Sequence, residues 1–379
     1  MLSESEIETV RARVDLRALA IDLGAVFRGR ARYGRCPICG GGPSAVRFEI
    51  LREGRSWVCA VCCDGGDAIN LVMKVKGVGF RDAVAALGGP TVLSESERAR
   101  LDAKIAADRQ KRAAEADAYR QRERRRLHAL WIAAAPLSGT PVETYLRARG
   151  ISWRLDDLTL RFATLPFFHG ESVDERGRKS PRVIHSGAVM LAAIVGADGR
   201  FAGLHQTWID VARPGCKAEI FDPDDGEQLG AKKMRGHKLG GYIRLTRGDD
   251  VTRLVSGEGI ETTLSVREAL REGFCYRAAG DLGNLSGKAM ATLAHPTLKT
   301  PLGRAQRVPG PDPDLDSEAM IVPVETRELV LVKDGDSDPF MTDLAITRAG
   351  RRHARRGLVI REMAPPPGLD FNNVLRGVA

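Results

Sequence analysis

The sequence VTRLVSGEG at residues 251–259 is followed directly by IETTLSVREALREG at residues 260–273. The first run is apolar and ends in glycine, which is typical of a buried strand, and the second has the composition of a helix. A second apolar run, RELVLVKDGDSD at residues 327–338, ends in acidic residues and precedes another helical stretch, residues 342–355. Because strands that alternate with helices form parallel sheets covered by helices, the last third of the chain predicts an α/β domain.

Carboxylates follow both of these strands. Glu258 comes directly after the first strand, and Asp334, Asp336 and Asp338 follow the second. The carboxyl ends of parallel strands meet at one edge of a sheet, which is where α/β folds place their sites. Carboxylates gathered at one edge repel one another unless cations neutralise them, and oxygen ligands suit Mg²⁺ or Mn²⁺. The sequence therefore predicts a catalytic Mg²⁺ or Mn²⁺ site that handles phosphates, with solvated turn residues or a helix N-cap as the alternative.

A second candidate metal site lies near the N-terminus. Cys36-x-x-Cys39 and Cys59-x-x-Cys62 are separated by nineteen residues. They flank the stretch AVRFEILREGRSWVC at residues 45–59, whose alternation predicts a β-hairpin with its turn near residues 53 and 54. Four thiolates in this arrangement can close a tetrahedral site for one structural Zn²⁺. The adjacent Cys63 is the alternative to Cys62, which is preferred because it restores the two-residue spacing. Such an ion would stabilise a module that is too small to be held by its own core.

The cysteine content and the composition limit the class of protein. Seven cysteines are an odd number for a disulfide framework and indicate a metal site in a reducing compartment. No run of about 18 apolar residues occurs and the N-terminus lacks a signal-peptide pattern, so a cytoplasmic protein with no membrane partner is expected. A hydrophobic content of 43% excludes a disordered or fibrous chain. The formal charge of +9 fits a polyanionic partner and equally an ordinary soluble enzyme.

The 379 residues predict a multidomain protein of α/β and α+β type. Its expected segments are a zinc ribbon module at 1–90, a charged helical linker at 91–135, a basic mixed α+β subdomain at 136–248 and the parallel-sheet α/β domain at 249–379. The linker is rich in Ala, Arg, Glu and Lys and free of Gly and Pro between residues 94 and 135. This composition indicates a solvated spacer, with a surface that also touches nucleic acid as the alternative.

Particular elements are expected inside these segments. Periodicity predicts helices at 5–23 and 68–87, strands at 188–195 and 201–209, and a long Pro-rich loop at 292–326. A basic tract, AKKMRGHKLGGYIRL at residues 231–245, combines glycines with closely spaced cations.

The two acidic strand ends resemble a known family. A strand ending in Glu258-Gly259, together with a second strand ending in Asp334-x-Asp336, resembles the Toprim domain shared by bacterial-type primases, topoisomerases and some nucleases. The final turn, LDFNNVL at residues 369–375, is similar to the aspartate-phenylalanine-asparagine-aspartate element that closes Toprim domains of phage and plasmid primases. Asn373 stands where that element usually has an aspartate.

The rest of the chain carries the same resemblance. The cysteine module resembles the zinc-binding domain of bacterial-type primases, down to the glycine-glycine-aspartate tail at residues 65–67. The basic tract and the segment GTPVETYLRARGI at residues 139–151 are similar to primases of mobile elements. The order of zinc module, basic region and Toprim domain covers nearly the whole chain and is more specific than any single motif.

The resemblance implies a DNA primase that makes short RNA primers on single-stranded DNA from NTPs, for a phage, plasmid or integrated element. In such primases the Toprim carboxylates hold metal ions that bridge the phosphates of the nucleotide and the 3′-hydroxyl. By resemblance, Asp334, Asp336 and Asp338 bind metal. Glu258 binds it too or assists proton transfer. Glu261, three residues further on, is expected to be a charge on the helix surface, with a direct role in the site as the alternative.

Contacts to nucleic acid and nucleotide are also implied. The candidates for gripping template phosphate and triphosphate are four cations of the basic tract, Lys232, Lys233, Arg235 and Lys238. A plain basic surface loop is their alternative. The candidates for contacting single-stranded template are three hairpin residues, Arg52, Arg55 and Trp57. A place in the small core of the module is the equal alternative for Trp57.

Two rival functions remain open at this point. A Toprim-class nuclease would use the same carboxylates to hydrolyse a phosphodiester. A non-catalytic protein that binds single-stranded DNA or loads a helicase would not need them. Because the sequence has no G-x-x-x-x-G-K-[ST] loop, a helicase would have to be a separate partner.

Overall fold

A computed structural model describes residues 2–27, 33–40, 48–51, 54–59, 64–89, 94–175, 177–299, 305–335 and 337–377. Three predicted site residues, Arg52, Cys62 and Asp336, lie outside these ranges. The chain forms two compact units, residues 1–117 and 118–379, and each is described by itself. Within the described ranges, none of the helices combines the length and the apolarity that crossing a membrane requires.

The first unit contains short helices and a small antiparallel sheet in the order β1-β2-β3-β4-β5. Its elements are α1 (Glu4–Ala12), α2 (Leu16–Asp22), β1 (Val26–Phe27), β2 (Tyr33–Arg35), β3 (Phe48–Leu51), β4 (Ser56–Cys59), β5 (Asp64–Gly66), α3 (Ala68–Lys76) and α4 (Phe80–Ala86). Strands β3 and β4 pair in the register expected for the hairpin, with Phe48 opposite Cys59 and Ile50 opposite Trp57. These inward residues form the core of the module.

Two helices that the periodicity predicts as continuous are each divided. The first is interrupted before α2, because the carboxylate of Asp15 accepts hydrogen bonds from the backbone N–H groups of Arg17 and Ala18 at 2.9 and 3.0 Å. Because the Asp15 side chain caps the start of α2, it favours a break in the continuous helix that the sequence predicts. The second is interrupted after α3 at Gly77, whose φ of 67° is the left-handed conformation that ends helices.

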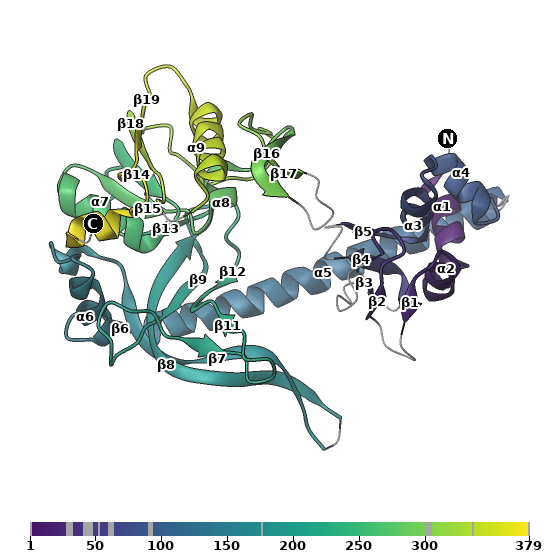
Figure 1. Ribbon diagram of the computed structural model, residues 1–379, viewed down its shortest axis with the longest axis horizontal. Coiled ribbons are helices and arrows are strands. Elements are labelled where there is room, and N and C mark those ends of the chain that lie inside the picture. The colour runs from purple at the N-terminus through teal and green to yellow at the C-terminus, as the bar shows by residue number, and fades with distance from the viewer. Residues whose placement is uncertain are drawn as a thin grey trace. The chain divides into compact units, whose positions relative to one another are not determined.

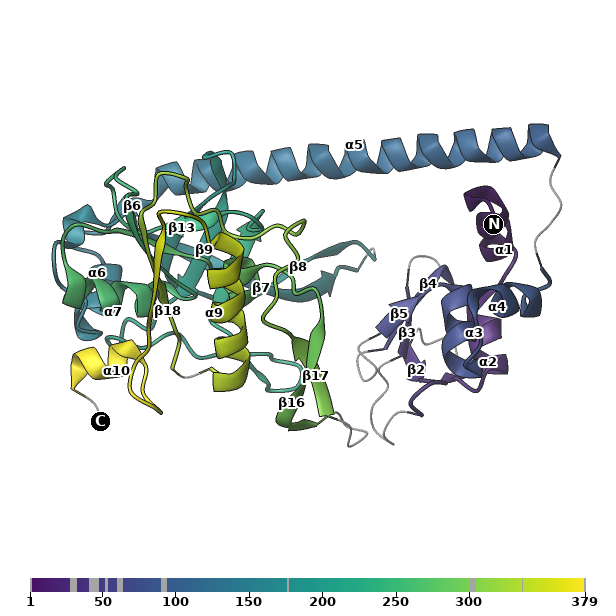
Figure 2. The same ribbon diagram turned by 90° about the horizontal axis from the view of Figure 1, so that it is seen from above.

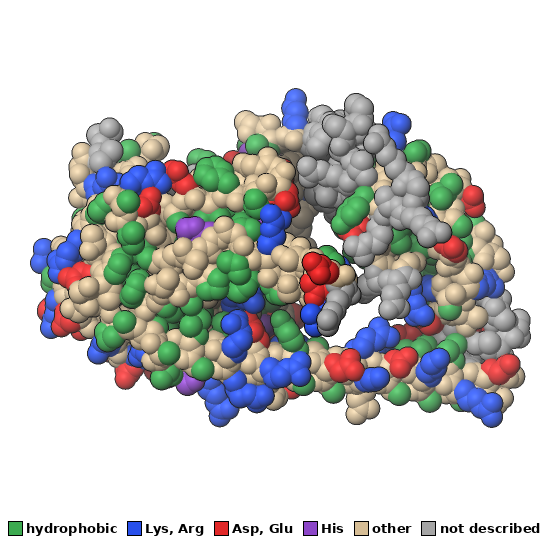
Figure 3. Space-filling model, turned by 90° about the horizontal axis from the view of Figure 1, so that it is seen from below, with side chains coloured by type: hydrophobic (Ala, Val, Ile, Leu, Met, Phe, Trp, Pro, Cys, Tyr) green, Lys and Arg blue, Asp and Glu red, His purple; other side chains and the backbone are tan. Residues whose placement is uncertain are grey.

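The long charged helix is observed as α5 (Glu95–Ala133), which passes the boundary between the two units at residue 117. Positive and negative side chains alternate along its surface, visible along the lower edge of Figure 3. Leu127 is the fully buried residue near its C-terminal end, where α5 joins the core of the second unit. The earlier part of the helix is mostly exposed, as expected of a solvated spacer.

The second unit contains a large mixed sheet and two small two-stranded sheets, β10-β11 and β16-β17. Its strands are β6 (Ala135–Pro136), β7 (Arg161–Val173), β8 (Lys179–Val195), β9 (Phe201–Trp208), β10 (Ile220–Phe221), β11 (Gln228–Leu229), β12 (Lys232–Gly236), β13 (Tyr242–Arg244), β14 (Arg253–Gly257), β15 (Cys275–Ala278), β16 (Thr292–Lys299), β17 (Ala305–Pro309), β18 (Glu328–Val332) and β19 (Val359–Met363). Its helices are α6 (Pro141–Ala148), the 3₁₀ turn η2 (Leu155–Asp157), α7 (Ile260–Leu270), α8 (Leu282–Ser286), α9 (Pro339–His353) and α10 (Phe371–Arg376).

The sheet joins an antiparallel part to a parallel part. The strand order is β12-β9-β8-β13-β15-β14-β18-β19, and β7 pairs with β8 outside this path. The strands β15, β14, β18 and β19 pair in parallel, as the alternation of apolar runs and helices predicts. Strand β13 is antiparallel to both β8 and β15, so residues before and after 248 share one hydrogen-bonded sheet (Figure 1).

Helices cover both faces of the parallel part. Val255 of β14 packs in the cluster that contains Leu264 of α7 and Leu146 of α6. Its neighbour Leu254 packs in the cluster that contains Ile346 of α9. Successive side chains of a strand point to opposite faces, so α6 and α7 cover one face and α9 covers the other.

The Pro-rich segment at 292–326 is not simply a loop, because it contains the two-stranded hairpin of β16 and β17. This hairpin lies beside α9 in both Figure 1 and Figure 2. Arg348 of α9 donates to the carbonyl oxygen of Gly310 at 2.5 Å and so ties the helix to the end of the hairpin. In a two-stranded sheet every strand is an edge, which is why Pro296 and Pro309 are tolerated there.

Candidate active site and zinc centre

The cysteine module brings three predicted ligands together. The sulfur atoms of Cys36, Cys39 and Cys59 lie within 4.8 Å of one another, and the Sγ atoms of Cys39 and Cys59 are 3.9 Å apart. Burial raises the pKa of the Cys36 thiol to about 11, so without a cation the thiol stays protonated. Soft sulfur ligands at this spacing fit Zn²⁺, whose charge would favour the thiolate form. The cluster could therefore hold zinc. The fourth predicted ligand, Cys62, is outside the described residues.

Trp57 belongs to the core of this module. Its side chain is 1% exposed, and its ring stacks on Phe48 with the centroids 5.6 Å apart. The indole Nε1 donates to the backbone oxygen of Asp67 at 3.1 Å. A ring enclosed in this way has no free face for a nucleic-acid base, so the geometry favours the core role. Arg55, by contrast, is exposed and lies 3.8 Å from a carboxylate oxygen of Glu8.

The carboxylates of Glu258 and Asp334 follow adjacent parallel strands. Gly257 at the end of β14 is opposite Val332 at the end of β18, so the two acidic residues emerge at the same edge of the sheet. Asp334 accepts a hydrogen bond of 3.3 Å from the hydroxyl of Thr262, in the first turn of α7. Hard oxygen ligands at one edge of a sheet fit Mg²⁺ or Mn²⁺.

Asp338 serves as the N-cap of α9. Its Oδ1 accepts a hydrogen bond from the backbone N–H of Met341 at 2.9 Å and lies 3.2 Å from Nε2 of His295. The Met341 N–H, followed by His295, lowers the pKa of Asp338. Within the described ranges, the cysteines are the one group of three or more ligand atoms that lie within 4.8 Å of one another. The hydrogen bond from Met341 favours the helix-cap alternative for Asp338, whereas Asp336 is outside the described residues.

Glu261 is buried, which corrects the expectation of a charge on the helix surface. It is 5% exposed and accepts a hydrogen bond of 2.8 Å from the hydroxyl of Tyr145. The Nζ atoms of Lys217 and Lys232 lie 3.7 and 3.6 Å from its two carboxylate oxygens. Burial alone would raise the pKa of Glu261, but the two lysines outweigh burial and lower it, so the group is ionised. Its partners come from distant segments, and no local pattern reveals them.

Lys232 links this buried network to the acidic strand ends. Glu261 raises the pKa of Lys232 against the opposing effect of burial, and Asp334 and Glu258 contribute further. The ammonium group of Lys232 thus lies in the electrostatic field of both predicted catalytic carboxylates. Lys217, which the sequence reasoning missed, has its pKa lowered by burial with Glu261 opposing that shift.

The remaining cations of the basic tract do not converge on the carboxylates. Residues 232–236 form strand β12, which pairs with β9, so the alternative of a plain surface loop is wrong for this part of the tract. Lys233 lies 3.8 Å from the centre of the Phe167 ring. Arg235 forms an ion pair of 3.4 Å with Glu123 of α5. Lys238 pairs with the carboxylate of Asp281. Because strand residues alternate, Lys233 and Arg235 lie on the face opposite to Lys232.

The final turn holds α10 against the site. Asp370 caps this helix by accepting from the backbone N–H of Asn373 at 2.5 Å. The buried side chain of Asn372 donates to the backbone oxygen of Arg149 at 2.6 Å and to the hydroxyl of Ser265 at 3.3 Å. These bonds fasten the C-terminal element to α6 and α7. This structural role of the turn does not require an acidic residue at position 373.

Comparisons with known proteins give similarities of limited extent. A family model described as a domain of unknown function (DUF7146) matches residues 121–245. No curated protein sequence matches the chain. The Aquifex aeolicus primase structure, with zinc-binding and RNA polymerase domains, is 13% identical with a TM-score of 0.34, and the match covers 99% of this chain and 83% of that chain.

Two further solved structures are similar over about two thirds of the chain. A DnaG primase catalytic domain bound to ssDNA is 15% identical with a TM-score of 0.41, over 69% of this chain and 78% of that chain. The E. coli primase catalytic core is 14% identical with a TM-score of 0.40, over 67% of this chain and 75% of that chain. At TM-scores below 0.5, function has to be argued from the residues of the chain itself. These three solved structures are primase domains, and the likeness to this chain is one of fold.

Proposed function

We propose that the chain is a DNA primase that synthesises short RNA primers on single-stranded DNA by metal-dependent nucleotidyl transfer. The observation that carries this proposal is the pair Glu258 and Asp334 at the ends of adjacent parallel strands, with the ammonium group of Lys232 in their electrostatic field. Carboxylates for a metal next to a cation for phosphate are the components that phosphoryl transfer requires. A three-cysteine cluster in the same chain supports a primase over a nuclease.

Each group has a distinct part in the proposed reaction. Glu258 and Asp334 would hold Mg²⁺ or Mn²⁺, which would supply charge neutralisation to the phosphates during nucleotidyl transfer. Lys232 and Lys217 present ammonium groups to the remaining phosphates, since both are fixed beside the same carboxylate. Glu261 keeps the two lysines in place and raises the pKa of Lys232. Asp336 is proposed as a further metal ligand on its position in the sequence alone.

The zinc module is proposed to contact the template. Its cluster of Cys36, Cys39 and Cys59, completed by Cys62, would hold one structural Zn²⁺. The exposed Arg55, together with Arg52, would bind template phosphates by charge. We further propose a cytoplasmic protein that acts for a phage, plasmid or integrated element and relies on a separate helicase.

Primer synthesis on defined templates tests the proposal. Purified chain is incubated with labelled NTPs, Mg²⁺ or Mn²⁺ and single-stranded DNA, and products are separated by length. Products longer than a dinucleotide that depend on Asp334 support a primase. Template shortening without incorporation of NTPs would show a nuclease instead. DNA binding that is unchanged in Asp334→Asn, with no product of either kind, would show a non-catalytic binding protein.

A further inference from the structure

A separate cavity lies at the other end of the parallel strands. It has a volume of about 740 Å³ and is formed by the end of α5, the start of α6, the segment around η2, and Arg247. Arg247 precedes β14 and Glu258 follows it. The five residues of β14, roughly 16 Å of strand at about 3.3 Å per residue, therefore lie between Arg247 and Glu258 in the chain. Every residue that lines the cavity belongs to the second unit.

The inner wall of the cavity is apolar and partly aromatic. Leu137, Leu155, Leu158 and Leu160 contribute to it, and all four are buried in the core of the unit. At one side lies the partly buried indole of Trp131. A rigid apolar surface beside an aromatic ring favours a flat, weakly polar group such as a nucleic-acid base.

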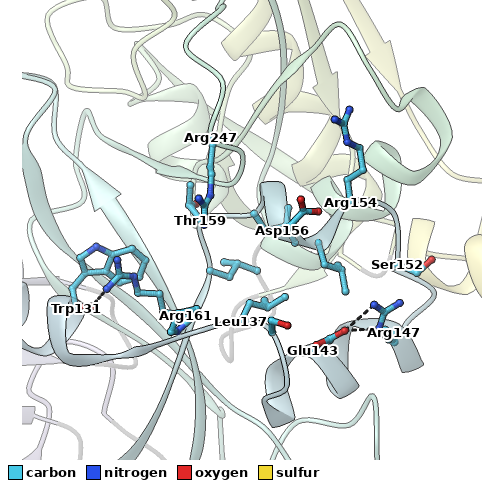
Figure 4. A pocket seen from close by; sticks show the side chains of 15 residues that line it. Trp131, Leu137, Glu143, Arg147, Ser152, Arg154, Asp156, Thr159, Arg161 and Arg247 are labelled. Atoms are coloured by element: carbon cyan, nitrogen blue, oxygen red, sulfur yellow. Dashed lines mark hydrogen bonds and ion pairs between the residues drawn. The ribbon is translucent and has the colours of Figure 1, made fainter.

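The opening of the cavity is cationic. Four arginines line it, Arg147, Arg154, Arg161 and Arg247, against the two carboxylates of Glu143 and Asp156. Figure 4 shows Arg147 paired with Glu143, and Arg161 against Trp131 on the other side. Arg154 is paired with Glu272 at 2.8 Å.

Two of these arginines keep their charge available. The guanidinium of Arg161 lies 4.7 Å from the Trp131 ring centre and donates to the backbone oxygen of Trp131 at 2.8 Å. That contact orients the group without neutralising it. Arg247 is exposed, and among the described residues its guanidinium forms no ion pair with a carboxylate. Guanidinium groups left in this state bind phosphate through charge-assisted hydrogen bonds.

We propose that this cavity binds a phosphorylated nucleoside, with the base against Trp131 and the leucines and the phosphate between Arg161 and Arg247. A cavity of about 740 Å³ falls within the usual range for small-ligand sites, roughly 300 to 1,000 Å³. The nucleoside is either a free nucleotide or one residue of a single strand, since both present the same base and phosphate. The site goes beyond the proposed primase reaction, because it shares no residue with the carboxylate edge.

Fluorescence titration and calorimetry of the full chain test the site. The titrations use ATP in one arm and a short oligothymidylate in the other, in an Asp334→Asn background that weakens binding at the proposed metal site. Arg247→Glu is expected to weaken binding about tenfold or more, as loss and reversal of a phosphate contact predicts. The matched control, Arg356→Glu, reverses the charge of an exposed arginine after α9 and is expected to leave binding within about twofold. Trp131→Phe is expected to abolish ligand-dependent quenching.

The outcomes separate the possibilities. Binding of ATP identifies a free nucleotide as the ligand, and binding of the oligonucleotide alone identifies a residue of a strand. Absence of binding in both arms overturns the proposal, as does equal weakening by the Arg247 and Arg356 variants when circular dichroism shows both to be folded. Primer synthesis by the wild type is measured in parallel. Its failure with retained Arg247-dependent binding would remove the primase proposal and leave this site in place.

Discussion

The hydroxyl of Tyr145 on α6 donates a hydrogen bond of 2.8 Å to the buried carboxylate of Glu261 on α7. The same carboxylate holds the ammonium groups of Lys217 and Lys232. Helix α6 is thereby joined to α7, the helix next to the proposed metal site. The contact fixes the geometry of the cations that would meet a phosphate.

Removing the Tyr145 hydroxyl is expected to destabilise the second unit. Tyr145→Phe leaves the volume of the core unchanged but removes one hydrogen-bond donor from a buried carboxylate, which costs about 1–3 kcal/mol. Urea denaturation followed by circular dichroism measures the loss. Tyr119→Phe is the control, because Tyr119 is 59% exposed, and its effect should be close to zero. Equal stability of the two variants would contradict the role of this hydrogen bond.

Asp334 and Asp338 are expected to differ in function. Asp334→Asn should reduce primer synthesis at least about a hundredfold, since it removes a charged ligand from the proposed metal site. Asp338→Asn should keep most of the activity, because asparagine is as good an N-cap as aspartate. Asp338→Ala should retain catalysis while lowering the free energy of unfolding by about 1 kcal/mol. A stable but inactive Asp338→Asn variant would contradict this expectation and identify Asp338 as a metal ligand.

Zinc removal is expected to affect the first unit selectively. Cys59→Ser should lower the zinc content of the purified chain and expose residues 1–90 to proteolysis, because a structural zinc site contributes directly to folding. The second unit should resist proteolysis as in the wild type. Cys216→Ser provides the control, since Cys216 is an exposed cysteine outside the cluster. Full protection of the first unit without bound zinc would contradict the assignment.

Acid should destabilise the second unit before its carboxylates titrate. Burial lowers the pKa of His205 from its ordinary value of 6.5 to about 4, and burial does the same for His353. The unfolded chain therefore binds more protons than the folded chain across this interval, so the free energy of unfolding falls as the pH decreases from about 6.5 towards 4. His205→Gln should make this pH dependence shallower. Denaturation between about pH 6.5 and 5 measures it, and an unchanged slope would contradict the prediction.

Local sequence patterns were sufficient to predict the helices, strands and hairpins whose defining residues lie close together in the sequence. Strand β14, helix α7 and the hairpin of β3 and β4 follow from apolar runs and alternation, and the cysteine spacing predicts three sulfurs that the structure brings together. Capping and backbone geometry were missed because single residues such as Asp15 and Gly77 decide them. The alternation of Lys232 and Lys233 on an edge strand was missed as well, because glycines on both sides of the tract favour a loop in the sequence.

The parts of the site that depend on tertiary contacts were not predictable in this way. In the sequence alone, Glu261 resembles an exposed helix residue, because the lysines that neutralise its charge lie on other elements. Packing of α6 against α7 buries it. The helix N-cap that the sequence offers as an alternative for Asp338 is local, whereas its contact with His295 of the β16–β17 hairpin is a tertiary one that no local pattern predicts.

The position of β13 determines how the proposed site can move. Its backbone is hydrogen-bonded to β8 on one side and to β15 on the other. A hinge near residue 248 would have to break one of these ladders, so the lysine-bearing half and the carboxylate-bearing half cannot open and close like a clamp. We therefore expect Lys232 and Asp334 to form one preassembled surface of the proposed site.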